Sequence, residues 1–458
     1  MAALLAGCAS YRAKPLEPEK TAAAFETRSL SDAGLAAYAR KLGRADWPPA
    51  AWDADALTVA ALYYHPDLAV ARAQREGARA GIRAAGERPN PTLGVSPLEW
   101  INNPSQGLSP WVTGFSLDIP VETAGKRGAR LLKARAAEEQ ARLGLAAAVW
   151  QARGRVRAAL VAAWSAERAE DILAHQQEEL ATNERLLSER AAAGQVSPLS
   201  AAQAVLLAGR STLLLEDARR LRSDAVSQLA DALALPRRET ETLAFSSAAY
   251  LSIPALDPAA VAGARRAALL GRPDVLAALA AYAGAEADLR LEVARQYPDL
   301  HLGPGFTWDQ KQDKWAFGFS VPLPIMNRNG GAIAQARARR AEAQARFEAL
   351  QQKVIADVDR ASAAYAAAAH KLSAADAVLA RHERQDSALR KLMRPGDVSR
   401  LALFQARLDL DSTRLSRQDA LAQAQLALLA LEDALQKPLV GEGPPAAALE
   451  TAPGDGAP

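Results

Sequence analysis

Apolar residues recur every seven positions along two long stretches of the chain that contain no proline. These stretches run over 126–193 and 330–394, and each is followed by a shorter one with the same pattern, over 198–235 and 399–436. The heptad leucines include Leu173, Leu180 and Leu187 in the first pair and Leu401, Leu408 and Leu415 in the second. Because this spacing forms the seam between supercoiled helices, the pattern predicts two helical hairpins. Each is about 100 Å long at the helical rise per residue.

Four short segments are expected to be extended, and in the later one of each pair apolar and polar residues alternate with a period of two, which indicates strands. They cover 92–101, 111–119, 299–308 and 314–321. In the second segment one face carries Trp111, Thr113, Phe115, Leu117 and Ile119, and the other carries Gly114, Ser116 and Asp118. Strands of this length can cross a bilayer when tilted, and tryptophans beside the connecting loops match an interfacial aromatic girdle. A soluble hairpin with one half-buried face would show the same alternation.

The chain reads as a tandem duplication of a unit of about 200 residues. His65-Pro66-Asp67-Leu68 recurs as Arg272-Pro273-Asp274-Val275, and Gly194-Gln195-Val196-Ser197 recurs as Gly396-Asp397-Val398-Ser399. Each unit is expected to begin with one helix, over 54–87 and 258–295, followed by two strands and a long hairpin. We therefore expect a residual lipoprotein signal over 1–8, a polar tether over 9–53, repeats over 54–253 and 254–437, and a disordered tail over 438–458.

Composition and charge exclude several classes of protein. Lys and Arg number 55 against 52 Asp and Glu, a net charge of +3 that is too balanced for a nucleic-acid binder. One cysteine excludes an intrachain disulfide framework, and no segment approaches the ~20 apolar residues of a membrane-spanning helix. The five histidines show no metal-ligand spacing, and there is no P-loop or nucleophile elbow. We therefore expect no enzyme, no cofactor and no metal site.

The run Leu5-Ala6-Gly7-Cys8 resembles a bacterial lipobox, the end of a lipoprotein signal peptide. We therefore expect Cys8, the single cysteine, to be lipidated and to anchor the chain in membrane lipid. An ordinary cysteine near a frayed terminus is the alternative.

Four strands are too few to close a barrel, and an open sheet edge in lipid leaves backbone groups without hydrogen bonds. Three copies would supply twelve strands, within the range of outer-membrane barrels. We therefore expect a homotrimer in which the helices continue the barrel as a second cylinder. The competing interpretation is a structural coiled-coil lipoprotein that bridges envelope layers, which would need no lipid-facing strands.

With these features, residues 54–437 resemble the TolC-like outer membrane factors of Gram-negative efflux systems. The resemblance implies a mainly α fold, in which long α-helical hairpins form a periplasmic tunnel and four strands per chain contribute to a 12-stranded trimeric β-barrel. It also implies a passive channel in the bacterial outer membrane. Its partners would be a periplasmic adaptor (membrane fusion protein) and an inner-membrane resistance-nodulation-division pump.

Two junction motifs resemble the CzcC-like heavy-metal branch of that family. They are Ile119-Pro120-Val121-Glu122 through Gly125-Lys126-Arg127, and Leu323-Pro324-Ile325-Met326-Asn327-Arg328-Asn329-Gly330-Gly331-Ala332-Ile333-Ala334. The resemblance implies heavy-metal cations as cargo, with drugs or other organic solutes as the alternative. We assign the barrel–tunnel junction to Gly125, Lys126, Arg127, Asn327, Arg328, Asn329 and Gly330. The glycines are expected to supply positive φ, and the asparagines to bond neighbouring backbone.

The duplicated Gly-x-Val-Ser motifs lie between each long helix and its return, where glycine ends one helix and serine caps the next. Plain hairpin capping would explain them. The resemblance implies that they also meet the adaptor, through Gly194, Gln195, Val196, Ser197, Gly396, Asp397, Val398 and Ser399. Where the family commonly has acidic gate residues this chain has Ala402 and Gln405. We therefore expect a basic or apolar periplasmic constriction at Arg400, Leu403 and Phe404.

Overall fold

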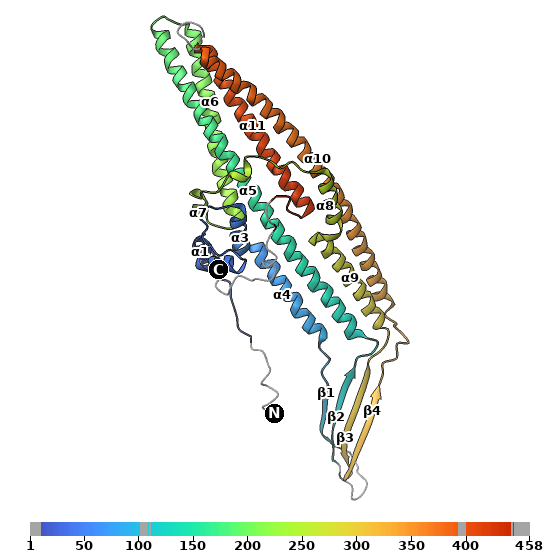
Figure 1. The fold of residues 1–458 in the computed structure, drawn as a ribbon. Helices are drawn as coiled ribbons and strands as arrows, with labels where there is room; N and C mark the ends of the chain where they lie inside the picture. The colour runs from blue at the N-terminus through green and yellow to red at the C-terminus, as the bar shows by residue number, and fades with distance from the viewer. Residues whose placement is uncertain (1–10, 101–108, 110, 393–399, 441–442, 444–458) are drawn as a thin grey trace.

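The computed structural model describes residues 11–100, 109, 111–392, 400–440 and 443. The molecule is elongated, with long helices along most of its length and a four-stranded sheet at one end (Figure 1). The mainly α fold with a small antiparallel sheet, expected from the sequence, is confirmed.

Eleven helices and four strands follow one another along the described residues. The helices are α1 (Pro18–Glu26), α2 (Ala33–Lys41), α3 (Ala54–Tyr64), α4 (Pro66–Gly86), α5 (Lys126–Ala192), α6 (Pro198–Leu233), α7 (Arg238–Glu241), α8 (Pro258–Gly271), α9 (Pro273–Ala294), α10 (Gly330–Leu392) and α11 (Arg400–Leu435). The strands are β1 (Thr92–Trp100), β2 (Trp111–Val121), β3 (Leu300–Asp309) and β4 (Gln312–Ser320).

The two long hairpins predicted from the heptad pattern are present as α5 with α6 and α10 with α11 (Figure 1). The described ends of these helices lie within two residues of the predicted ends. With 67 residues, α5 is about 100 Å long. The seam between α5 and α6 is rich in alanine, because Ala204, Ala208 and Ala218 are buried along one face of α6. Small side chains at these positions let the two helix axes approach closely.

The single helix expected over 54–87 is instead two helices, α3 and α4, and that expected over 258–295 is α8 and α9. The breaks fall at His65 and Arg272, whose ψ angles of 124° and 134° are extended. Each residue precedes a proline, whose ring disfavours helical backbone at the preceding position. Pro66 and Pro273 then begin the next helix, where their missing N–H costs nothing.

The segment 9–53 is not simply a polar tether, because its described part contains α1 and α2 and contributes to the core. Leu35 and Tyr38 are only 0% and 2% exposed. Arg28 Nη1 donates to the Ala234 carbonyl at the end of α6 over 2.9 Å. In the second half of the chain Arg272 Nη1 donates to the Ala434 carbonyl in the last turn of α11 over 2.5 Å. The N-terminal segment therefore packs against the end of the first hairpin.

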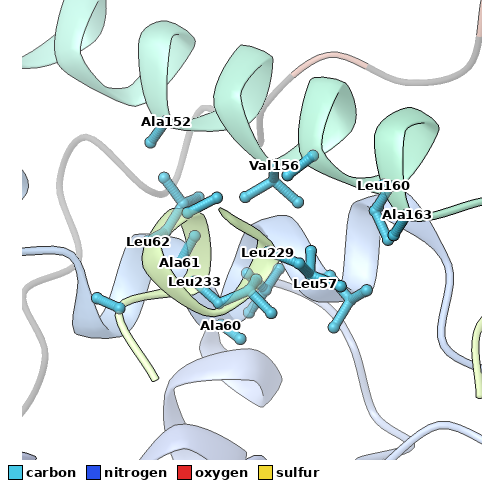
Figure 2. Packing of buried hydrophobic residues seen from close by; sticks show 14 of the residues in the cluster. Leu57, Ala60, Ala61, Leu62, Ala152, Val156, Leu160, Ala163, Leu229 and Leu233 are labelled. Atoms are coloured by element: carbon cyan, nitrogen blue, oxygen red, sulfur yellow. The ribbon is translucent and has the colours of Figure 1, made fainter. Parts of the chain in front are cut away.

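The largest core cluster lies where α3 crosses the two helices of the first hairpin. Leu57 and Leu62 of α3 pack with Val156 and Leu160 of α5 and with Leu233 of α6, all fully buried (Figure 2). A second cluster joins α8, α10 and α11. The core is thus concentrated around the middle of the molecule, which leaves the sheet and the hairpin ends projecting from it (Figure 1).

The two predicted strand pairs form one antiparallel sheet in the order β1-β2-β3-β4. Its centre is the pairing of β2 with β3, in which Phe115 lies opposite Phe306. A bulge between Ser96 and Glu99 shifts the register of β1. The β3–β4 turn places Gln310 and Lys311 at positive φ, 53° and 67°, as in the two-residue turns that match strand twist.

Candidate functional site

The sheet has one apolar face and one small, polar face. Residues directly opposite in neighbouring strands share a face, so the register defines both sets. The mostly apolar face carries Leu93, Val95, Trp100, Trp111, Phe115, Leu117, Ile119, Val121, Leu300, Leu302, Pro304, Phe306, Trp308, Trp315, Phe317 and Phe319, together with the polar Thr113 and Asp313 beside Trp308. The other face includes Gly94, Ser96, Gly114, Ser116, Asp118, His301, Gly303, Gly305, Thr307, Asp309, Lys314, Ala316, Gly318 and Ser320.

Aromatic rings run across the apolar face. Phe115 stacks on Phe306 with ring centroids 5.6 Å apart, and Phe306 lies 5.1 Å from Trp315. Phe317 and Phe319 of the edge strand are 84% and 76% exposed. An exposed aromatic surface of this kind favours contact with an apolar medium or another chain. The strands predicted to have two unlike faces do have them.

The polar face holds charged groups in pairs. His301 Nδ1 lies 3.0 Å from both carboxylate oxygens of Asp118, and Lys314 Nζ lies 2.6 Å from Asp309 Oδ2. Glycines occupy positions where strands approach closely. A Cβ on Gly114, for example, would lie 2.6 Å from the Phe306 carbonyl oxygen. This face is therefore suited to line a water-filled space.

Both outer strands of the sheet pair on one side only, since β1 and β4 are the ends of the strand order. The segment after β4 is also uncovered. Leu323, Ile325 and Met326 are 75%, 73% and 94% exposed. Unpaired strand edges and bare apolar side chains are both surfaces that other chains can cover.

The first junction between sheet and helix is held by contacts across the two halves of the chain. Gly125 has φ 72°, as expected, and Ala124 before it has φ 54°. Lys126 Nζ donates to Asp299 Oδ1 over 2.7 Å, and the Thr123 N–H donates to the same oxygen over 2.9 Å. Arg127 Nε donates to the Gly86 carbonyl over 2.7 Å. The junction residues thus tie the start of α5 to the end of α4 and to the residue before β3.

At the second junction the residue with positive φ is Asn329, at 59°, and not Gly330, which begins α10. Hydrogen bonds to nearby groups stabilise this left-handed backbone conformation of Asn329, as expected for asparagine. Its N–H donates to Asn327 Oδ1 over 2.8 Å, and its Nδ2 donates to both the carbonyl and Oε2 of Glu292, each over 2.9 Å. Arg328 is exposed.

Ion pairs with partly buried carboxylates strengthen this region. Burial raises the pKa of Asp299, but the hydrogen bonds from Lys126 and Thr123 outweigh it and hold that pKa below its usual value. Burial likewise opposes ionisation of Asp288 on α9. The Lys133 and Arg339 side chains nevertheless lower its pKa. Both carboxylates therefore remain charged at neutral pH and connect α9 to its neighbours.

The first hairpin tip ends as its sequence predicts. Gly194 has φ 68°, and the N–H groups of Gly194 and Gln195 donate to the carbonyls of Ala191 and Arg190 over 3.0 and 2.8 Å. This pattern is the glycine-terminated helix end known as the Schellman motif. Ser197 Oγ then accepts from the Leu199 N–H over 3.1 Å and caps α6.

Several sites predicted from the sequence lie outside the described residues. They are Cys8 and the second tip, Gly396, Asp397, Val398 and Ser399. The side chains of Arg400, from the expected constriction, and of Ala402 are also outside the description. Leu403 is only 8% exposed and packs within the chain's own helices, so it does not line an open space. Phe404 is half-buried and Gln405 is exposed.

The helix α6 has an apolar surface that the sequence analysis did not single out. By length and composition alone α6 could cross a membrane, which the sequence analysis did not expect, yet only 22% of its most apolar stretch is buried. Its exposed leucines repeat every seven residues in two adjacent rows. The rows are Leu199, Leu206 and Leu213, and Leu207, Leu214 and Leu221. Because α6 packs along α5 through its alanines, this is a second heptad seam that the chain leaves uncovered.

The structure also groups three side chains that the sequence left unrelated. His175 and Glu179 of α5 and Asp411 of α11 bring potential metal-ligating atoms within 4.8 Å of one another. The spacing of the histidines in the sequence did not indicate this group. The i, i+4 relation of His175 to Glu179 on a helix was the available signal, but Asp411 is distant in sequence.

Comparisons with known proteins agree with this architecture. The sequence model of the outer membrane efflux protein family matches residues 57–235 and 264–436. The cobalt-zinc-cadmium resistance protein CzcC of Cupriavidus metallidurans is 25% identical over 284 residues. The match covers 58% of this chain and 62% of CzcC, so the chain spans less than two thirds of that relative's length.

Solved structures share the fold. Crystal structures of CusC, a protein that forms a transmembrane channel, superpose with a TM-score of 0.65 at 20% identity, covering 86% of this chain and 95% of CusC. The outer membrane protein VceC from Vibrio cholerae gives a TM-score of 0.68 at 18% identity, covering 84% and 97%.

Proposed function

Because the chain belongs to the outer membrane efflux protein family, we propose that three copies form the outer-membrane channel of a tripartite efflux system. The observation that carries the proposal is the sheet with opposite apolar and polar faces and two unpaired edges. In lipid an unpaired edge is too costly to persist. Pairing β4 of one copy with β1 of the next removes all edges and yields a 12-stranded barrel of ordinary size.

The uncovered seam on α6 supports the same assembly. Its exposed leucines have the heptad spacing that lets a helix of another copy pack against them as in a coiled coil. Every chain has this seam and the same two strand edges, so a closed ring of three chains would bury both kinds of surface. The exposed segment at Leu323, Ile325 and Met326 is a further surface for the neighbouring copy to cover.

The channel works as a passive conduit. With the aromatic face toward lipid, the glycine, serine and charged residues of the other face line a wet lumen. Energy would come from an inner-membrane resistance-nodulation-division pump, reached through a periplasmic adaptor. The adaptor is proposed to meet the hairpin tips, of which Gly194, Gln195, Val196 and Ser197 are the described one. Lipidation at Cys8 would anchor each chain in the outer membrane.

We propose heavy-metal cations as the exported substrate. The similarity to CzcC, which is named for cobalt, zinc and cadmium resistance, supports this cargo. The junction motifs point the same way, since Gly125-Lys126-Arg127 and Asn327-Arg328-Asn329-Gly330 resemble the heavy-metal branch. Drugs or other organic solutes are the alternative cargo.

The channel and its cargo are tested separately. The molar mass of the purified chain in detergent is measured by light scattering, and a trimer is expected. The same protein is inserted into planar bilayers, where a stable ion conductance is expected. A monomer without conductance would exclude the channel. A deletion strain is then challenged with cobalt, zinc and cadmium salts and with a panel of organic toxins. If the deletion strain is sensitive only to the organic toxins, the exported substrate is organic and the proposal of metal cations is wrong.

A further inference from the structure

Three potential ligands meet where the first hairpin lies against the second, along α5 and α11 (Figure 1). We propose that His175, Glu179 and Asp411 bind a divalent transition-metal ion there. His175 Nδ1 lies 3.3 Å from Asp411 Oδ2. Because His175 and Glu179 are four residues apart, they project from one face of α5. An ion at this point would connect the two hairpins directly.

One oxygen of each carboxylate accepts a hydrogen bond from an arginine, which orients the carboxylate and leaves its second oxygen available. Arg407 Nη1 donates to Glu179 Oε1 over 3.1 Å, and Arg414 Nη1 donates to Asp411 Oδ1 over 3.0 Å. The second oxygen of Asp411 faces His175. The second oxygen of Glu179 is buried and has no hydrogen-bond partner among the described residues. A buried oxygen without a partner is costly, and a bound cation would satisfy it.

The site is closed on one side and open on the other. The Asp411 side chain is 4% exposed and that of Glu179 18%, whereas His175 is 57% exposed. An ion can therefore enter from solvent beside the imidazole and reach the buried carboxylates. A hydrophobic cluster of Leu173 and Leu215, joined by Leu415, lies within about one helical turn and sets the spacing of the helices.

The donor set selects the class of ion. One imidazole and two carboxylates suit Zn²⁺, Co²⁺ and similar ions, whereas Mg²⁺ and Ca²⁺ prefer oxygen ligands alone. Three protein ligands leave a fourth position for water, as in open zinc sites. Ligand bonds of about 2.0–2.2 Å require donor atoms roughly 3–3.5 Å apart. Without an ion the three ligand atoms lie within 4.8 Å of one another, so they would have to move closer together on binding.

The test uses the full-length, tag-free chain, purified in detergent and stripped with chelator. It is titrated with CoCl₂ and followed by visible absorption, and then with ZnCl₂ by calorimetry. We expect one equivalent per chain, a cobalt spectrum with nitrogen and oxygen ligands, and a higher melting temperature with metal. His175→Ala and Asp411→Asn should each weaken binding by about tenfold or more. His370→Ala, which removes an exposed histidine of α10 outside the cluster, should bind like the parent.

Binding of less than one equivalent, or equal binding by His175→Ala and the parent, would overturn the proposal. Should Asp411→Asn fail to fold, His175→Ala decides, because its side chain is mostly exposed. A channel that conducts in bilayers but binds no cobalt would refute this site and leave the proposed function intact. Conversely, cobalt binding without conductance would refute only the channel.

Discussion

Lys126, the first residue of α5, donates through Nζ to Asp299 Oδ1, one residue before β3, over 2.7 Å. The pair joins the first half of the chain to the second at the point where sheet becomes helix. The Lys126 side chain is 9% exposed and that of Asp299 33%. Because β2 of the first half pairs with β3 of the second, this contact helps to hold the two strand pairs in register.

Replacing Asp299 with asparagine should lower the stability of the folded chain by about 2 kcal/mol at neutral pH, the scale of a hydrogen bond to a charged group. The folded-state pKa of Asp299 is depressed. Its stabilisation is therefore present above the unfolded pKa of about 3.9 and lost as pH falls through the folded value. Denaturant midpoints measured from neutral to acid pH should converge for parent and variant. Lys353→Met, in a pair whose lysine is 72% exposed, should match the parent throughout.

The two faces of the sheet should respond differently to charge. Phe317→Arg places a cation on the exposed aromatic face, where about 2–4 kcal/mol is lost near the middle of a bilayer. Ala316→Arg, at the neighbouring position of the same strand, places it on the polar face. We expect Phe317→Arg to reduce trimer recovered from outer membranes on unheated gels, and Ala316→Arg to affect it far less. Equal yields would contradict the assignment of faces.

A bulky residue at the first hairpin tip should block function without preventing assembly. A Cβ on Gly194 would meet no atom within 4 Å, so the cost of Gly194→Trp is limited to its positive φ, roughly 1–2 kcal/mol. We expect lost metal resistance in cells with normal trimer levels. Gly43→Trp is the matched control, because Gly43 also has positive φ and open space, but lies far from the tip in sequence. Loss of resistance in both variants would remove the evidence for docking at the tip.

The buried Glu432 side chain should be among the most sensitive positions of the helical part. It is 1% exposed, pairs with Arg153 and Arg157, and accepts N–H bonds from Leu439 and Val440. Glu432→Ala removes the carboxylate beside two partly or fully buried guanidinium groups, at a cost of about 3–5 kcal/mol.

The midpoint of chemical denaturation should fall accordingly for Glu432→Ala. Glu342→Ala, which breaks an exposed pair with Arg346, should lower the free energy of unfolding by no more than about 1 kcal/mol. Similar shifts for the two variants would mean that the buried network is not important for stability.

Local patterns in the sequence determined the elements of this protein. Heptad leucines predicted both hairpins, alternation predicted the strands and their faces, and Gly194 with Ser197 predicted the described tip. The break at Pro66 was also readable, since proline restricts the residue before it. These features depend on neighbours a few positions apart, and so a single chain segment contains the whole signal.

Contacts between distant segments were decided only by the tertiary structure. They join residues that are far apart in the sequence or that belong to different elements. Examples are the pairing of β2 with β3, the burial of Leu403, the packing of α2 onto the core and the proximity of His175 to Asp411. Helix and strand periodicity says which face of an element is apolar, but not which element covers it. Which element covers a given face depends on the packing of all elements at once. That packing brings the candidate metal ligands together and leaves the α6 leucines exposed.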